Sequence, residues 1–449
     1  MKKVPDTRYA QTPDGVYLAY RTIGRGPFDM VCPFDWMGNV DVLLDTEPTT
    51  KGMVEAMGAF ARVIFFDRRG TGLSSRDVPP PNLETVVADC RVVLDELSID
   101  RSVVFGFKAG GAAGALLAAT HPERVRSMIW YNPAARSTWA HDYPWGVGPQ
   151  YVERSERAIL EHWGTAEYGP AMNATERLPS GMSGHLADDP DELLGMLSRH
   201  TATPNIALQM QRNWYETDVR AILPSIRAPI LIFSHGPDHT QAEYVASLIP
   251  HADLITVTSD RDRPAPSDAT RVLDPIREWL GAPAPVQDVD SILSTVLFTD
   301  IVDSTATLAE RGDRGWRQLV EQHHAIVRAA LARWSGLEND TAGDGFYATF
   351  DGPAKAIRCA LEVVDRVREL GLEVRAGVHT GECTMIDGKV GGLAVSIGAR
   401  VAATARPSEV RVSQTVKDLT AGSGFLFDDA GEHELKGVPG RWGLYRVLR

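Results

Sequence analysis

The sequence predicts two domains of different fold class, an α/β domain with a helical insertion followed by a smaller α+β domain. The first 280 of the 449 residues alternate short apolar strands with amphipathic helices, a pattern typical of an α/β sheet. Residues 281–290 are rich in Ala and Pro and favour an extended spacer. The last third opens on an apolar strand, a long helix and a hairpin. We therefore expect domains at residues 1–280 and 293–449, joined by a linker at 281–292.

The composition limits the classes of protein that fit. A formal net charge of -13 argues against a nucleic-acid partner, because a phosphate backbone demands a basic surface. No apolar run approaches the roughly 18 residues that span a bilayer, and the N-terminus lacks the apolar core of a signal peptide. The four cysteines are scattered without a CxxC pair, which indicates neither a zinc site nor a disulfide framework. We expect a cytoplasmic protein without a membrane span.

The first domain reads as buried strands separated by covering helices. Strands are expected at residues 16–21, 29–32, 62–66, 102–105, 125–130, 229–233 and 253–257. Helices are expected at residues 83–97, from Gly111 to Thr120 and at 268–280. Residues from about 138 to 223 look mainly helical and rich in Trp and Tyr, which predicts an insertion between two halves of the sheet.

Three segments give this domain a resemblance to the α/β-hydrolase fold with a helical cap. They are Asp67-Arg-Arg-Gly-Thr-Gly-Leu-Ser74, Gly106-Phe-Lys-Ala-Gly110 and Phe233-Ser-His-Gly-Pro-Asp238. The catalytic signature of that family is broken, because Lys108 stands where the nucleophile elbow carries serine. Arg263 stands where the histidine is expected, and only Asp238 falls where the triad acid lies. Without Ser and His no triad chemistry is available, so we expect no hydrolase activity.

Lys108 allows two interpretations. A lysine desolvated at the elbow could have a lowered pKa and form a Schiff base, which would give a residual hydrolase or a lysine-dependent enzyme. We favour the other interpretation, in which Lys108 pairs with an acid such as Asp238 or reaches into the pocket. The domain is then a regulatory pseudoenzyme whose pocket under the cap holds an unknown small ligand.

Two acidic residues stand out in the last third of the chain. Asp300 ends the apolar run Val296-Leu-Phe298, and Ser304-Thr305 can then cap a helix. Asp344 has glycine on both sides and precedes a strand-like run, which predicts the tip of a tight hairpin. A carboxylate at the end of a buried strand is costly unless a cation meets it. The two acids could share divalent cations, as metal-assisted phosphoryl chemistry requires, or could be two solvated turn aspartates.

Five motifs in this region give it a resemblance to the class III nucleotidyl cyclases. In family order they are residues 298–305, 343–345, 375–381, 399–401 and 435–437. The resemblance covers roughly residues 294–449 and implies a ferredoxin-like fold. It also implies conversion of ATP to cyclic AMP and pyrophosphate with two Mg²⁺ or Mn²⁺ ions per active site. Family sites form between two cyclase domains, so one domain per chain implies a head-to-tail homodimer.

The resemblance also assigns roles to single residues. Asp300 and Asp344 would ligate both metals with help from the main-chain carbonyl of Ile301. Arg400 would stabilise the transition state, while Lys436 and Arg375 would contact phosphates. The residues that would wrap the phosphates near a helix start include Phe298, Thr299, Asp303 and Ser304.

The chain departs from the family at three positions. Asp340 stands where the base-selecting lysine lies, and Lys389 stands where its acidic or threonine partner lies. The swapped pair could still read adenine, Asp340 could act like the glutamate of guanylate cyclases, or the two could only pair with each other. Ser396 replaces the ribose-orienting asparagine, which predicts slow turnover.

The sequence therefore predicts a slow adenylate cyclase regulated by a ligand-binding pseudo-hydrolase domain. One alternative is a guanylate cyclase that uses GTP. The other is a degenerate signalling protein that binds a purine nucleotide and a small ligand and turns neither over.

Overall fold

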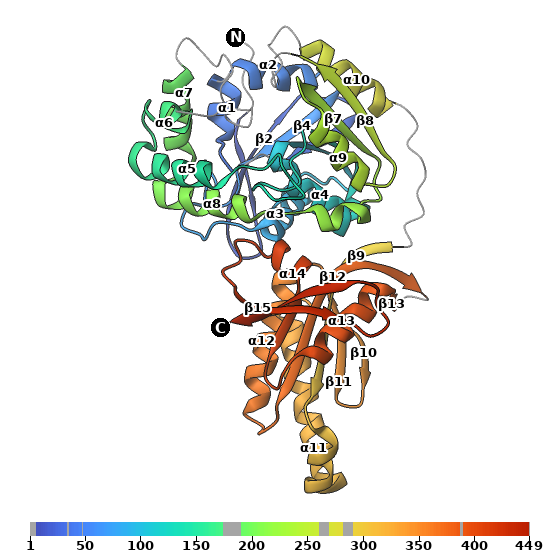
Figure 1. Ribbon diagram of the computed structural model, residues 1–449. Coiled ribbons are helices and arrows are strands. Elements are labelled where there is room, and N and C mark those ends of the chain that lie inside the picture. The colour runs from blue at the N-terminus through green and yellow to red at the C-terminus, as the bar shows by residue number, and fades with distance from the viewer. Residues whose placement is uncertain are drawn as a thin grey trace. The chain divides into compact units, whose positions relative to one another are not determined.

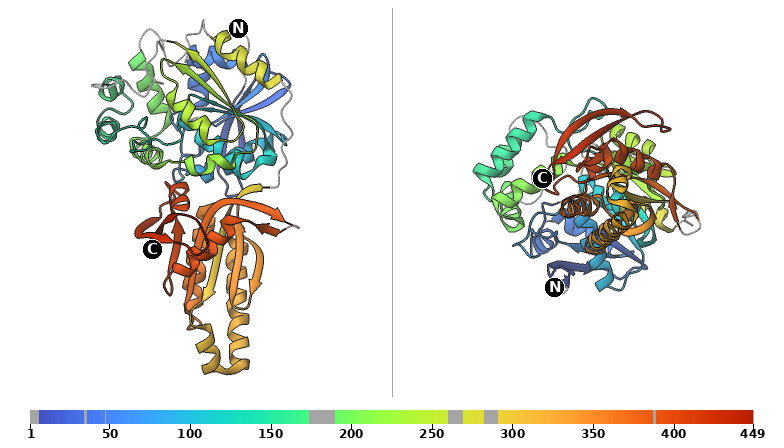
Figure 2. Two further views of the ribbon diagram at one scale, coloured as in Figure 1. Left: turned by 45° about the vertical axis from the view of Figure 1, so that its right-hand side comes forward. Right: turned by 90° about the horizontal axis from the view of Figure 1, so that it is seen from below.

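The computed structural model describes residues 6–33, 36–46, 48–173, 190–259, 269–281, 291–386 and 389–448. The chain forms two compact units, Met1–Asp288 and Val289–Arg449 (Figures 1 and 2). Each unit contains its own sheet. No helix in the described parts of the chain is both long and apolar enough to cross a membrane.

The first unit is built on one sheet whose strands run in the order β1-β2-β4-β3-β5-β6-β7-β8. The strands are β1 Arg8–Gln11, β2 Tyr17–Ile23, β3 Phe28–Cys32, β4 Ala61–Phe66, β5 Ser102–Phe107, β6 Val125–Tyr131, β7 Ile230–Gly236 and β8 Ala252–Thr258. The β1–β2 and β2–β4 pairs are antiparallel, and the other pairs are parallel. Every residue of β7 is buried, as expected for a strand covered on both faces.

Helices cover this sheet and connect its strands. They are α1 Val40–Thr46, α2 Pro48–Met57, α3 Leu83–Glu96, α4 Gly111–Thr120, α9 Thr240–Leu248 and α10 Ala269–Gly281. Helix α4 contains nine buried residues of ten, because its Ala and Gly side chains let it lie close to the sheet. Helix α3 begins where the Asn82 side chain accepts a hydrogen bond from the main-chain N–H of Thr85.

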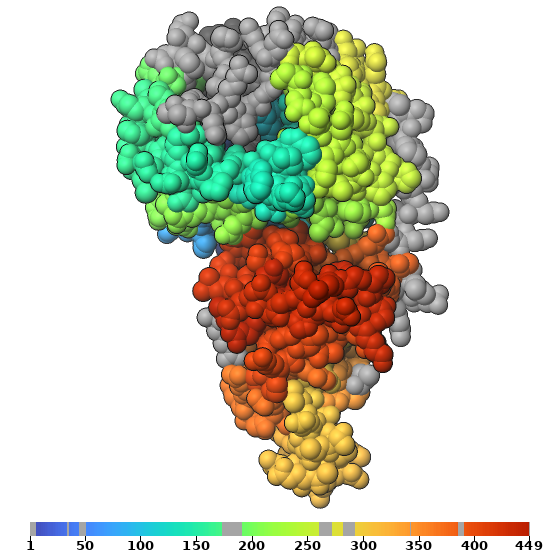
Figure 3. All heavy atoms as spheres, viewed as in Figure 1, coloured from blue at the N-terminus to red at the C-terminus, as the bar shows by residue number. Residues whose placement is uncertain are grey.

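The insertion expected at about 138–223 is helical and lies between β6 and β7. It contains α5 Pro149–His162, α6 Tyr168–Asn173, α7 Pro190–Thr201 and α8 Pro204–Glu216 (green in Figures 1 and 3). These helices have an apolar core of their own, in which Trp163 stacks on Trp36 with ring centroids 5.9 Å apart. This core explains the abundance of Trp and Tyr in the segment.

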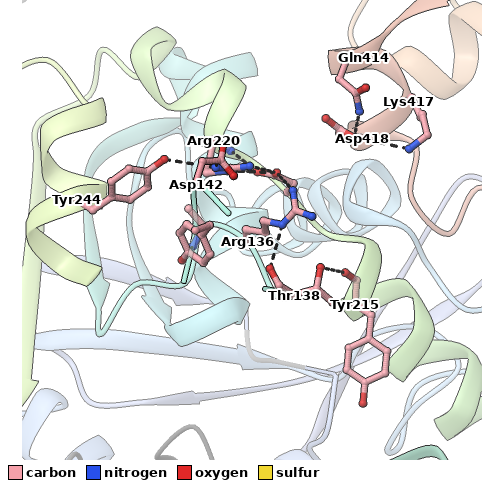
Figure 4. Close-up of polar contacts among 12 residues, drawn as sticks. Arg136, Thr138, Asp142, Tyr215, Arg220, Tyr244, Gln414, Lys417 and Asp418 are labelled. Atoms are coloured by element: carbon pink, nitrogen blue, oxygen red, sulfur yellow. Dashed lines mark hydrogen bonds and ion pairs between the residues drawn. The ribbon is translucent and has the colours of Figure 1, made fainter. Parts of the chain in front are cut away.

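Ion pairs hold the two ends of the insertion together at the sheet. Arg220 donates to Asp142 at 2.8 Å and to the Tyr244 hydroxyl at 3.4 Å (Figure 4). It also donates to Asp218 at 2.9 Å. Arg136 donates to the same Asp218 carboxylate at 2.9 Å. Because these contacts join the start of the insertion to its end, they fix the place where the cap leaves and rejoins the sheet.

The second unit has a sheet in the order β10-β11-β9-β12-β14-β16-β15, with β13 paired to β12. Its strands are β9 Ser291–Ile301, β10 Leu337–Ala342, β11 Gly345–Phe350, β12 Val374–Ile386, β13 Lys389–Gly391, β14 Val410–Ser413, β15 Leu426–Glu434 and β16 Arg441–Leu448. Its helices are α11 Ser304–Arg333, α12 Pro353–Arg368, α13 Leu393–Thr404 and α14 Gln414–Leu419. The first six elements follow a β-α-β-β-α-β order, which with this strand order is ferredoxin-like.

Alternating side chains of β9 face different layers of the second unit. Leu297 belongs to the core formed with α11 and α12, whereas Val296 and Phe298 pack with residues of α13 on the other side of the sheet. The first half of α11 is largely exposed, and Gly312 interrupts its helical geometry with a φ of +69° (Figure 3). The strand β9 therefore carries side chains to both layers and brings its last residues to the edge where α11 begins.

Candidate active site

Asp300 lies next to last in β9 and is met there by a cation. The register of β9 and β12 places Arg375 directly opposite it. The Arg375 guanidinium donates to Oδ2 of Asp300 from Nη2 at 2.5 Å and from Nε at 3.1 Å. The two side chains are 35% and 40% exposed respectively, so the pair lies at the rim of the sheet and solvent still reaches it. The acid that the sequence places at a strand end is therefore compensated by an arginine.

Asp344 lies at the tip of the hairpin that joins β10 to β11. Ala342 pairs with Gly345 across this hairpin, and Gly343 adopts a φ of +64°, which suits glycine. Nε2 of His324 on α11 lies 3.1 Å from the Gly343 carbonyl oxygen. The Oδ2 atom of Asp344 is buried and has no hydrogen-bond partner among the described residues. A buried carboxylate oxygen without a donor is a position where a cation would be stabilised.

The two acids belong to neighbouring strands. Phe346 pairs with Thr299 in the antiparallel ladder of β11 and β9. Continuing that register by two residues sets Asp344 opposite Ile301, beside Asp300. The pattern of apolar run and glycine-flanked acid therefore brings the two carboxylates to the same end of the sheet, as the sequence predicts.

A cleft of about 460 Å³ opens beside the Asp300–Arg375 pair. It is lined by Phe298, Thr299, Asp300, Asp340, Gly345, Phe346, Tyr347, Arg375, Val395, Ala399, Ala402 and Ala403. The Thr299 side chain is buried, and its hydroxyl has no hydrogen-bond partner in the described part of the chain. The cleft thus combines two acids, a guanidinium and an available hydroxyl with aromatic and small apolar side chains.

The residues present fit a divalent cation only in part. The described residues contain no group of three or more His, Cys, Asp or Glu side chains with the spacing of a complete metal site. Asp300 and the orphaned Oδ2 of Asp344 are hard oxygen donors, which suit Mg²⁺ and Mn²⁺. Mg²⁺ is commonly held by one or two carboxylates together with substrate phosphates. The acids therefore fit a metal site that a phosphate-bearing substrate completes.

Other predicted site residues lie in or near the cleft. Asp340 lines it and is exposed, and its Oδ1 accepts a hydrogen bond from the main-chain N–H of Thr341 at 3.0 Å. Ser304 begins α11, and the preceding Asp303 is exposed with a φ of +53°. Lys389 begins β13, but its side chain lies outside the described structure.

Three predicted residues do not line the cleft. Ser396 and Arg400 are exposed on α13, and Lys436 is exposed after β15. None of the three is among the residues that line the described cleft. One chain therefore brings together Asp300, Asp344, Arg375 and Asp340, whereas the predicted transition-state Arg400 is exposed on α13 and is not part of the lining.

Sequence reasoning did not select Tyr347 or His324 as site residues. Tyr347 stacks on Phe298, and its hydroxyl donates to the Val390 carbonyl at 3.0 Å. The only sequence signal for Tyr347 was its place in a strand-like segment of alternating side chains. The sequence alone does not show which residues of neighbouring strands lie on the same face of the sheet. His324 contacts Gly343 of the hairpin from α11, 19 residues earlier in the chain, and no local sequence pattern marks that contact.

The second unit contains two buried histidines, His323 and His379. Burial lowers the pKa of His323 to about 4, and its ring lies edge-on to Phe346 with no hydrogen-bond partner for either nitrogen among the described residues. Burial also lowers the pKa of His379 to about 4, and its Nδ1 lies 2.8 Å from the Ser413 hydroxyl. Both imidazoles are therefore neutral at pH 7.

In the first unit, Lys108 occupies the strand–turn–helix between β5 and α4. Its φ is +48°, and its carbonyl accepts a hydrogen bond from Trp130 Nε1 at 2.7 Å. The backbone is tightly packed here, because a Cβ on Gly106 would lie 2.4 Å from the Cα of Gly111. The Lys108 ammonium lies 5.7 Å from the centroid of the Phe107 ring. The strained elbow is therefore present with a lysine at its apex.

Of the other two triad positions, 238 and 263, the structure describes only Asp238. Asp238 is exposed and accepts hydrogen bonds from the Thr240 main-chain N–H at 3.0 Å and from its hydroxyl at 2.9 Å. These bonds lower the pKa of Asp238 and place it at the start of α9. Arg263 lies outside the described residues.

The turn after β4 contains a buried acid. The Asp67 carboxylate accepts hydrogen bonds from the main-chain N–H groups of Val40 at 2.9 Å and Leu73 at 2.8 Å. Burial raises the pKa of Asp67 to about 7, although these two hydrogen bonds oppose the rise. Asp67 therefore connects the turn to the start of α1.

Comparison with known families gives one match for each unit. Residues 52–258 match the family described as the alpha/beta hydrolase fold. Residues 285–448 match the family described as the adenylate and guanylate cyclase catalytic domain. The predicted order of a hydrolase-like domain and a cyclase-like domain is confirmed.

Individual relatives match one unit or the other. The chain is 28% identical over 196 residues to RutD of Azorhizobium caulinodans, a candidate carbamate hydrolase; the match covers 44% of this chain and 71% of that protein. It is 31% identical over 173 residues to a pH-sensitive adenylate cyclase of Mycobacterium tuberculosis, covering 34% of this chain and 40% of that protein. The solved adenylyl cyclase CyaB from P. aeruginosa is 18% identical with a TM-score of 0.34, covering 36% of this chain and 97% of that chain.

Proposed function

From a chain that joins an alpha/beta hydrolase fold to a class III cyclase catalytic domain, we propose a nucleotide cyclase that converts ATP to cyclic AMP and pyrophosphate. The supporting observation is the cleft of the second unit. Asp300 and Arg375 line it, and the hairpin that carries the orphaned Asp344 carboxylate adjoins it. Paired acids beside an arginine are the groups that bind a metal-chelated triphosphate.

The proposed reaction is attack of the ribose 3′-hydroxyl on the α-phosphorus, with pyrophosphate as the leaving group. Two divalent cations, when bound, lower the pKa of that hydroxyl and neutralise the triphosphate. Asp300 and Asp344 would hold them, with the main-chain carbonyl of Ile301. The buried hydroxyl of Thr299 would donate to a phosphate oxygen, since it has no other described acceptor. Arg375 would contact a phosphate as a bidentate donor.

The complete site requires a second copy of the chain. Arg400 and Lys436 are exposed, and neither lines the described cleft that contains Asp300. We therefore propose a head-to-tail homodimer in which these two cations reach the cleft of the other protomer. There Arg400 would stabilise charge that develops at the α-phosphorus, and Lys436 would bind the leaving phosphates.

Base choice depends on Asp340, which lines the cleft. As an acceptor it fits the N6 amino group of adenine, with Lys389 as the donor to N1. The same carboxylate also fits the N1–H and N2–H groups of guanine. We place ATP first and GTP second, and Asp340→Asn would weaken whichever base the carboxylate recognises.

The test is an assay of the full chain with ATP or GTP and with Mn²⁺ or Mg²⁺, followed by chromatography of the cyclic nucleotide. Wild type should produce cyclic AMP slowly, because Ser396 keeps only one hydroxyl to orient the ribose. Asp300→Asn and Asp344→Asn should each lower the rate by about 100-fold or more, because each removes a metal-binding charge. The absence of any cyclic nucleotide from wild type under all four conditions would refute the proposed activity.

A second candidate is a protein that binds purine nucleotide without turning it over. The acid at 340, the lysine at 389 and the serine at 396 favour it. It predicts saturable binding of a fluorescent ATP analogue that Asp300→Asn weakens, together with no product. The two assays on the same preparation therefore separate the enzyme from the binding protein.

We also propose that the first unit is a regulator and not a hydrolase. The elbow carries Lys108, and the sequence has Arg263 where the triad histidine is expected. A small ligand under the cap would then change cyclase turnover. The first unit should therefore show no esterase activity.

A further inference from the structure

The guanidinium of Arg375 and the carboxylate of Asp300 form a pair at the position where a metal would have to bind. Both donors of the pair reach the same oxygen, Oδ2, at 2.5 and 3.1 Å. Among the described residues, Arg375 forms its ion pair with the Asp300 carboxylate. The other carboxylate oxygen, Oδ1, accepts no hydrogen bond within the described chain. A cation thus already occupies half of the Asp300 carboxylate.

The pair changes the charge that a metal would meet. Asp300 and Asp344 carry two negative charges and Arg375 one positive charge, which leaves one net negative charge. The Oδ2 of Asp344 is buried and has no described donor, so its charge is not compensated locally. A divalent cation binds more weakly to a site of net charge −1 than to one of −2, because the Coulomb attraction scales with the product of the charges.

We propose that Arg375 is an exchangeable internal counter-ion of the metal site. It neutralises Asp300 while no metal is bound, and it leaves the carboxylate when a divalent cation arrives. The freed guanidinium then turns to the triphosphate, so that metal binding and phosphate binding are coupled through one side chain. The second step rests on the proposed cyclase function, whereas the first concerns metal binding alone. Arg375 thus has two successive partners, first the Asp300 carboxylate and then a phosphate.

The test measures Mn²⁺ binding to the nucleotide-free full chain by the electron paramagnetic resonance signal of free Mn²⁺. Arg375→Met removes the charge and keeps the approximate length of the side chain. Arg446→Met is the matched control, because Arg446 faces Asp428 directly across β16 and β15 and pairs with it on an exposed surface. Arg375→Lys keeps the charge, and Asp300→Asn identifies the binding that belongs to this site.

Arg375→Met should bind Mn²⁺ at least about threefold more tightly than wild type, because a partly exposed ion pair contributes up to a factor of about five. Arg446→Met and Arg375→Lys should stay within twofold of wild type, and Asp300→Asn should lose the site. Equal or weaker binding by Arg375→Met would overturn the proposal. The proposal would also be overturned if Arg375→Met bound no Mn²⁺ at millimolar concentration. In that case the positive charge of Arg375 would not be the cause of weak metal binding.

A kinetic readout tests the second step. If the released guanidinium binds phosphate, Arg375→Met should raise the KM for the metal–nucleotide complex while it tightens Mn²⁺ binding. A merely structural role would change both in the same direction. The Mn²⁺ titration needs no turnover, so it still decides the counter-ion proposal if the chain makes no cyclic nucleotide.

Discussion

Phe298 on β9 and Tyr347 on β11 face each other in direct register, and their rings stack with centroids 4.7 Å apart and planes 4° from parallel. Both rings line the cleft beside Asp300. The Tyr347 hydroxyl also donates to the Val390 carbonyl at 3.0 Å, which ties β13 to the stack. The stacked pair therefore forms one wall of the cleft and anchors the short strand that carries Lys389.

The two contacts of Tyr347 can be separated by substitution. Tyr347→Phe keeps the stack and loses one hydrogen bond, so it should lower the free energy of unfolding by about 1 kcal/mol. Tyr347→Ala also removes the ring, so it should cost about 2 kcal/mol more and weaken binding of a fluorescent ATP analogue. Urea unfolding and nucleotide titration of the full chain measure both effects. Equal losses in the two variants would show that the hydrogen bond, and not the stack, maintains this wall.

Stability of the second unit should depend on pH through His323. The pKa of His323 is lowered to about 4 in the folded chain, against about 6.5 when unfolded, so the unfolded chain binds the proton more readily. The contribution of His323 to the free energy of unfolding is complete above pH 6.5. It is lost as the pH falls toward 4, at about 1.4 kcal/mol per pH unit. His323→Leu should flatten this slope in urea unfolding between pH 8 and pH 5.

The control for that experiment is His200→Leu, since His200 is exposed on α7. It should leave the slope unchanged. His379 has a similarly lowered pKa and should contribute part of the pH dependence that remains in His323→Leu. An unaltered slope in His323→Leu would contradict the assignment.

Two glycines of one turn should tolerate alanine very differently. A Cβ on Gly72 would lie 2.1 Å from Oδ2 of Asp67, and Gly72 has a φ of +55°. Asp67 cannot move aside without losing the hydrogen bonds from Val40 and Leu73. Gly72→Ala should therefore cost about 3 kcal/mol or more. Gly70 has a φ of +82° but its nearest contact would be 3.5 Å away, so Gly70→Ala should cost about 1 kcal/mol.

Thermal unfolding of the two alanine variants checks this difference. The Tm of Gly72→Ala should fall well below that of Gly70→Ala. Similar Tm values would mean that the Asp67 carboxylate relocates at little cost.

Replacing Lys108 by serine should not create an esterase. Lys108→Ser would restore a hydroxyl at a φ of +48°, but position 263 is arginine and offers no general base. Both wild type and Lys108→Ser should hydrolyse p-nitrophenyl butyrate at the rate of buffer alone. Hydrolysis by Lys108→Ser clearly above that of wild type would show that another base serves the elbow and that the first unit is closer to an enzyme than to a regulator.

The sequence signals that were local predicted the structure well. The apolar run before Asp300 and the glycines around Asp344 placed both acids at strand ends, and the Trp- and Tyr-rich segment at about 138–223 is the helical insertion. The contact between Asp300 and Arg375 was not predicted, because it joins residues 75 positions apart through the register of β9 and β12. The Phe298–Tyr347 stack depends on strand pairing in the same way.

The retention of the elbow with lysine at its apex separates shape from reactivity. The bend is maintained by the close approach of Gly106 to Gly111 and by the Trp130 hydrogen bond, neither of which involves the side chain at 108. A residue there needs only to accept a left-handed backbone, at about 1–2 kcal/mol. The side chain at the apex of this turn can consequently be replaced during evolution without a change in the surrounding backbone.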